Sequence, residues 1–122
     1  MLIRALLLIC LLAITHSALA AGGAIREMAG ILIGLEHYPS DAEKVTLKNI
    51  AASTDSTEQE RVLAAAISNM NHNVANADRG KVRQIADDAG ASGAVRDLAK
   101  IMLNISHKPS ASDRSKLQDL MK

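Results

Sequence analysis

Three histidines recur at one position of an internal repeat, and they are the side chains best suited to chemistry in this chain. His37, His72 and His107 are spaced 35 residues apart. Imidazole nitrogens are common ligands of zinc, copper, nickel and iron, so the three residues are candidate ligands for a metal or a haem. A Cys-x-x-Cys-His sequence, which would attach a c-type haem, is absent.

The expected spacing of the repeats argues against one shared ion. Packed helices lie about 8–10 Å apart, whereas zinc holds its nitrogen ligands at about 2.0–2.1 Å. Equivalent residues of successive repeats should be at least about one helix spacing apart, so one ion cannot easily bind two of the histidines and certainly not all three. We therefore predict no metal and no other cofactor. We expect each histidine instead to close a helix, where a protonated imidazole suits the negative end of the helix dipole. A metal or haem carrier that uses the histidines singly is the alternative.

The repeat extends well beyond histidine. An arginine stands eleven residues before each histidine, at Arg26, Arg61 and Arg96, and an acid followed by a base comes six residues after it. A fixed period of this length is typical of stacked helical units. We predict a single domain over residues 21–122, made of repeats at about 22–56, 57–91 and 92–122. The arginines are expected to pair with acids of neighbouring repeats.

Each repeat contains two apolar stripes at helical spacing. Met28, Leu32 and Leu35 follow one another in steps of four and three, which places them on one helix face. Leu47 and Ile50 begin a second stripe, and both stripes recur in the next two repeats. Strand patterns are absent. The sequence therefore predicts an all-α fold of six helices in three tandem hairpins, arranged as a short α-solenoid or a compact bundle.

Capping residues mark where these helices begin. Ser40 with Glu43 and Ser110 with Asp113 have the spacing of capping boxes, Thr57 precedes Glu60 in the same way, and Ser92 is the matching residue of the third repeat. In the second repeat Ala75 replaces the serine, so Asn76 is expected to cap that helix.

The first twenty residues are predicted to be a cleaved signal peptide. A basic start with Arg4 is followed by an apolar run, and Ala18-Leu19-Ala20 supplies a cleavage pattern before Ala21. The only cysteine, Cys10, lies in this leader. We expect a periplasmic or secreted protein that has no membrane segment after cleavage.

Composition excludes several classes of function. The chain has 14 Lys and Arg against 13 Asp and Glu, so it presents no strong charge to a polyanion. Tyr38 is the only aromatic residue, which leaves no platform for stacking bases. We therefore predict no binding to nucleic acid. No catalytic motif is present, so we also predict that the protein is not an enzyme.

Binding residues are expected where the repeats differ, in the turns within the hairpins. These turns should line up along one edge of the stack, with Tyr38 as an exposed aromatic anchor. The predicted partner-binding residues are Glu36, Tyr38, Asn71, Asn73, Asn76 and Lys108. We interpret the chain as a protein-binding module.

In size, export signal and helical content the chain resembles the immunity proteins that protect bacteria from periplasmic cell-wall amidases delivered by type VI secretion. The resemblance is one of class and carries no residue with it. It implies an inhibitor whose partner is a secreted hydrolase. A structural homo-oligomer, such as a homodimer joined through the uncapped ends of the stack, is a further alternative.

Overall fold

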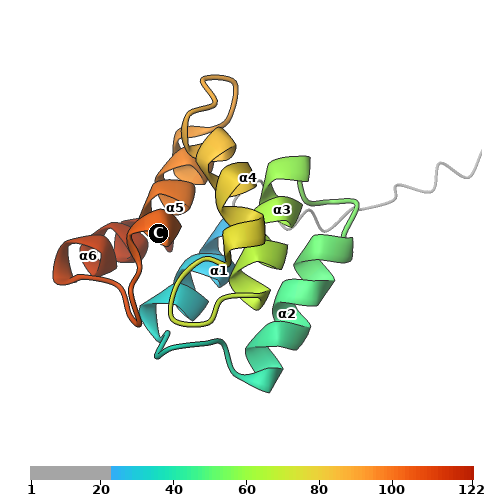
Figure 1. Cartoon of the computed structure of the whole chain (residues 1–122). Coiled ribbons are helices and arrows are strands. Elements are labelled where there is room, and N and C mark those ends of the chain that lie inside the picture. Colours follow the sequence, from blue (N-terminus) through green and yellow to red (C-terminus); the bar gives the residue numbers. More distant parts are fainter. Residues whose placement is uncertain (1–22) are drawn as a thin grey trace, which may run out of the picture.

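The computed structural model describes residues 23–122 and contains six helices (Figure 1). They are α1 (Gly23–Ile33), α2 (Asp41–Ala52), α3 (Glu58–Ser68), α4 (Asn76–Ala86), α5 (Gly93–Asn104) and α6 (Ala111–Leu120). This confirms the predicted all-α fold of six helices, whereas the expected signal peptide lies outside the described residues. Among those residues, no helix has the length and apolar character needed to cross a membrane.

The predicted apolar stripes form the core. Met28, Leu32 and Leu35 of the first repeat are buried, as are their equivalents in the other two repeats. The second stripe is buried as well, and Leu47, Val82 and Leu117 each have no exposed surface. Because α1, α3 and α5 also contact one another, the first helices of the three repeats form the centre of the molecule.

The helix starts follow the predicted capping, with one exception. Ser40 and Glu43 form a reciprocal capping box, and Thr57, Ser92 and Ser110 each accept a backbone N–H from the residue three positions on. The prediction that Asn76 caps α4 is wrong. Ala75 occupies the cap position without a side-chain hydrogen bond, and Asn76 is the first residue of the helix.

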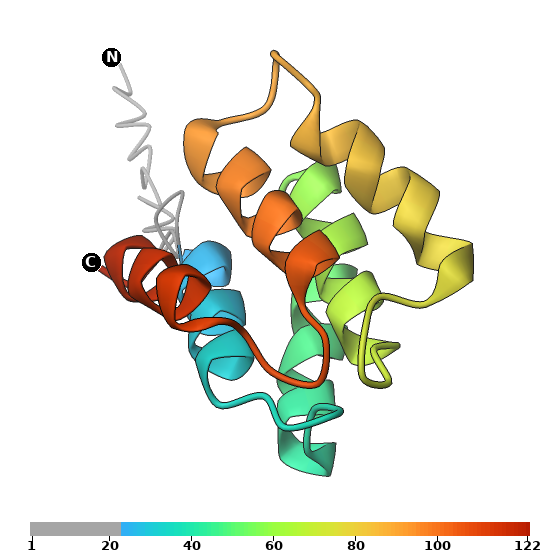
Figure 2. The ribbon, with the colours of Figure 1, turned by 60° about the vertical axis from the view of Figure 1, so that its left-hand side comes forward.

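The three repeats close into a ring. The most extensive contacts join the second helix of one repeat to the first helix of the next, α2 to α3 and α4 to α5. The last helix, α6, packs against α1 in the same manner (Figure 2). The protein is therefore the compact bundle rather than an open solenoid, and the two ends of the array, which we expected to be uncapped, cover each other.

Two arginines mark this closure. Arg61, at the start of α3, donates from Nη1 to the carbonyls of Ser56 (2.9 Å) and Ser53 (3.3 Å), just beyond the end of α2. Arg26 of α1 donates from Nη2 to the carbonyl of Lys122 (2.9 Å), just beyond the end of α6. Helix α6 therefore has the same position relative to α1 as α2 has relative to α3. The expected pairing of these arginines with acids is wrong, since the ion pair found among residues 23–122 joins Lys122 to Asp119.

A closed ring predicts that α6 is as important for stability as an internal helix. Leu117 in α6 and Leu47 in α2 occupy equivalent positions and are both fully buried. We expect Leu117→Ala and Leu47→Ala each to lower the free energy of unfolding by about 2–5 kcal/mol, in one cooperative urea transition. An early, separate transition of the Leu117→Ala variant would show that α6 is a frayed end and would contradict the ring.

Candidate metal site

The connections inside the three repeats meet at one end of the bundle (Figures 1 and 2). Helices α1, α3 and α5 end at Ile33, Ser68 and Asn104, and each histidine lies a few residues beyond, in the connection to the next helix. The prediction that the histidines close these helices is therefore wrong. The turns also meet around a point and do not line up along an edge, because the repeats are related by rotation around the ring.

The backbones of the three histidines form a closed cycle of hydrogen bonds. The N–H of His37 donates to the carbonyl of His107 (2.8 Å), that of His107 to His72 (2.6 Å), and that of His72 to His37 (2.5 Å). Each repeat gives and receives one bond. This cycle fixes the three α-carbons around an approximate threefold axis, so their side chains must share the same space.

Each histidine adopts a backbone conformation that side chains other than glycine rarely take. The φ angles are 73° at His37, 68° at His72 and 67° at His107, and no other non-glycine residue of the described chain has a positive φ. Around His37 and His107 the N–H of the following residue also donates to the carbonyl of the preceding one, at 2.9 Å in both cases, which is the pattern of a tight γ-turn. Glycine would adopt this conformation without strain, so three histidines here indicate that the imidazole itself is needed.

The three imidazoles converge through the same atom. The Nδ1 of His72 lies 2.7 Å from that of His107 and 3.0 Å from that of His37, and the remaining pair is 3.2 Å apart. The expectation that the histidines are too far apart to share an ion is wrong. It assumed a translation of one helix spacing between repeats, whereas the ring brings equivalent residues together at its axis. Within residues 23–122, this is the group of His, Cys, Asp and Glu side chains that could hold a metal ion.

Hydrogen bonds among the three Nδ1 atoms cannot satisfy all of their lone pairs. An imidazole Nδ1 presents either one N–H or one lone pair in the plane of its ring. If one of the three nitrogens is protonated, it can donate toward the other two, but their lone pairs then still face each other at about 3 Å. A cation on the axis accepts all three lone pairs at once. The arrangement therefore supplies three nitrogen ligands that could hold a metal ion.

His72 also resists protonation. The pKa of His72 is lowered from its ordinary value of 6.5 because the imidazolium is partly desolvated among its neighbours and is repelled by positive charge on His107 and His37. A lowered pKa keeps the imidazole in the neutral form that a metal requires. Local electrostatics thus favour the neutral, ligand form of His72.

The residues on either side of the histidines form an exposed rim around the cluster. It contains the predicted binding residues Glu36, Tyr38, Asn71, Asn73 and Lys108, all exposed. Tyr38 is 60% exposed, and the Nζ of Lys44 lies 5.9 Å from the centre of its ring. Asn76 is also exposed but belongs to the first turn of α4, outside this rim. Ser106, the equivalent of Glu36 and Asn71, was missed, although its repeat position could have identified it.

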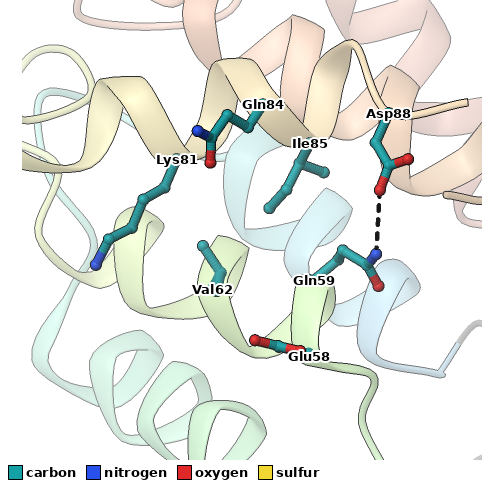
Figure 3. Close-up of a pocket in the computed structure, with 7 residues that line it drawn as sticks. All are labelled: Glu58, Gln59, Val62, Lys81, Gln84, Ile85 and Asp88. Atoms are coloured by element: carbon teal, nitrogen blue, oxygen red, sulfur yellow. Dashed lines mark hydrogen bonds between the residues drawn. The ribbon is translucent and has the colours of Figure 1, made fainter. Parts of the chain in front are cut away.

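A hollow in the surface lies away from the histidine cluster. It is an open groove of about 690 Å³ between α3 and α4, where Val62 and Ile85 form an apolar floor and Gln59 donates a hydrogen bond to Asp88 (3.4 Å) (Figure 3). Lys81 and Glu58 contribute charges of opposite sign. The groove contains no histidine and no residue of the rim, and we place the candidate site at the histidine cluster because its atoms converge on one point.

Comparisons with known proteins provide no precedent for this site. No protein-family model matches the chain, and no curated protein or solved structure is similar to it. What the site can bind therefore follows from its own atoms, which are three imidazole nitrogens held around an axis.

The backbone at the histidines predicts an unusual order of stability. In the metal-free protein, kept so by a chelator, we expect His72→Gly to be more stable than His72→Ala by about 1 kcal/mol, because a left-handed conformation strains alanine but not glycine. Urea denaturation measures the difference. Ala65→Gly, at an exposed position inside α3, is the control and should lose about 0.5–1 kcal/mol. If His72→Gly proves the less stable of the two, the positive φ at this residue is contradicted.

The pKa of His72 predicts that acid weakens the metal-free fold. Because this pKa is lower in the folded than in the unfolded chain, the unfolded chain binds the proton more readily. The contribution of neutral His72 to folding stability is then fully present above pH 6.5, and it is lost as the pH falls through the lowered pKa of the folded state. Urea denaturation between about pH 7.5 and pH 5 should show this loss. It should be smaller in His72→Asn, since asparagine tolerates a positive φ and carries no proton. An equal loss in both proteins would refute the assignment to His72.

Proposed function

We propose that this protein binds a divalent transition-metal ion through the Nδ1 atoms of His37, His72 and His107. The observation that carries the proposal is the convergence of these nitrogens to within 3.2 Å of one another at the axis of the ring. Three strained turns and a cycle of backbone hydrogen bonds support it, because they hold the three imidazoles together in an exposed position outside the core.

The donor set favours ions of the nickel, copper and zinc group. Neutral imidazole suits these ions, whereas calcium and magnesium prefer carboxylate and carbonyl oxygens. The candidate cluster contains three histidines and neither a carboxylate nor a thiolate. We further propose that the signal peptide exports the protein, so that it binds its ion in the periplasm or outside the cell.

A protein-binding role is the second candidate, and the exposed rim favours it. Residues of all three repeats that we expected to bind a partner flank the histidines, with the exposed Tyr38 among them. A partner bound there would cover the ion. Inhibition of a secreted hydrolase, as in an immunity protein, stays a prediction for this surface.

Metal titration tests the proposed function. We expect calorimetry with Ni²⁺, Cu²⁺ or Zn²⁺ to give one ion per chain, and the ion to stabilise the fold by about 2.7 kcal/mol when its free concentration is a hundred times Kd. His37→Asn, His72→Asn and His107→Asn should each weaken binding by about 100-fold or more, because each removes one of three ligands. Asparagine keeps the fold, since it tolerates the turn.

Asn71→Ala is the matched control, because it changes an exposed rim residue beside His72 without removing an imidazole. Its affinity should equal that of the unchanged protein. Metal analysis of the purified protein gives an independent readout. Binding that survives any one of the three histidine substitutions undiminished would overturn the proposal.

A further inference from the structure

The separations of the ligand nitrogens indicate the coordination geometry for which the site is built. At metal–nitrogen distances of about 2.1 Å, neighbouring ligands lie about 3.4 Å apart around a tetrahedral ion and about 3.0 Å apart around an octahedral ion. The three Nδ1 separations are 2.7, 3.0 and 3.2 Å. All are shorter than the tetrahedral value, and they scatter around the octahedral one. The histidines therefore match one triangular face of an octahedron.

The orientation of the rings agrees with this arrangement. Their planes meet at 73°, 85° and 74°, so each ring turns its edge to the next. Three nearly perpendicular rings can direct their Nδ1 atoms at one ion without overlapping. The peptide groups of the three histidines are hydrogen-bonded to one another, and the imidazoles themselves are exposed. An ion bound to the three exposed rings would therefore keep its other coordination positions accessible from solvent.

The charge of the ion and of the rim residues indicates which ligand would fill the free coordination positions. Three neutral imidazoles leave both positive charges of a divalent ion uncompensated. Among the rim residues, Glu36 and Lys108 carry opposite charges that cancel, and the other four are uncharged. A second copy of this chain could offer three more imidazoles, but these would leave the same two charges uncompensated inside an interface. An anionic oxygen chelator would neutralise the ion and fill adjacent positions together.

We propose that the open face of the bound ion takes a small chelating dicarboxylate, so that the protein holds a metal–chelate complex and not a bare ion. This inference rests on the proposed metal-binding function. Two carboxylate oxygens of the chelator bind adjacent positions on the ion, and water completes the sixth. The three histidines hold the ion from the side of the fold, and the exposed rim surrounds the chelator.

The test uses the purified protein loaded with Co²⁺, whose six-coordinate complexes absorb visible light weakly and whose tetrahedral complexes absorb it strongly. We expect a weak spectrum that shifts when one equivalent of isotopically labelled oxalate is added. After gel filtration, about one oxalate per bound ion should remain with the protein. The metal-free protein and His72→Asn should retain none, and labelled acetate, which cannot chelate, should be lost.

The possible failures are distinguishable. If no cobalt binds, the proposed function itself fails. If cobalt binds with a strong tetrahedral spectrum, or if oxalate passes through the column or strips the ion, metal binding stands and the chelate proposal is overturned. A cobalt-dependent dimer that excludes oxalate would likewise overturn it, because the open face would then be filled by a second copy.

Discussion

The cycle of hydrogen bonds among the peptide groups of three histidines is the constraint on which this structure depends. Each repeat contributes one donor and one acceptor, and the cycle is complete only if the third repeat returns to the first. The packing of α6 on α1 and the bond from Arg26 to Lys122 make the same closure on the outside of the molecule. A ring leaves no terminal repeat with an uncovered apolar face. This explains how three repeats form a core without the polar capping units that open arrays need.

The same closure creates the candidate site and its strain. Left-handed backbone costs a side chain other than glycine about 1–2 kcal/mol, and the chain accepts this cost three times, at the same position of each repeat. Glycine would remove the strain and leave the cycle of peptide bonds intact. Since histidine stands there each time, the side chains are best explained by a ligand that needs all three of them. Strain at a site is usually maintained by the rest of the fold, and here the buried stripes of six helices provide that support.

Local patterns predicted the helices but could not predict the ring. The apolar stripe of Met28, Leu32 and Leu35 and the box of Ser40 with Glu43 are each defined by residues three or four positions apart in the chain, so the sequence specifies them directly. The relation between repeats depends on a rotation that a period of 35 residues does not encode. A translation separates equivalent histidines, whereas a threefold rotation joins them on the axis. One signal was present: Arg26 repeats the role of Arg61 but has no preceding repeat in the sequence, which suits a ring in which the last repeat takes that place.

At this end of the molecule the histidines are the same in all three repeats, whereas the rim residues differ. In the proposed function, the histidines are identical in the three repeats because an ion on the axis would bind each repeat through the same atom. The rim residues differ, with Glu36, Asn71 and Ser106 at one repeat position and Tyr38, Asn73 and Lys108 at the other. A bare, spherical ion could not distinguish these side chains, so the proposed ion accounts for the repeated histidines but not for the varied rim. A ligand of lower symmetry on the ion would contact Tyr38, Lys108 and Glu36 unequally, and the unequal rim is what such a ligand needs for one preferred orientation.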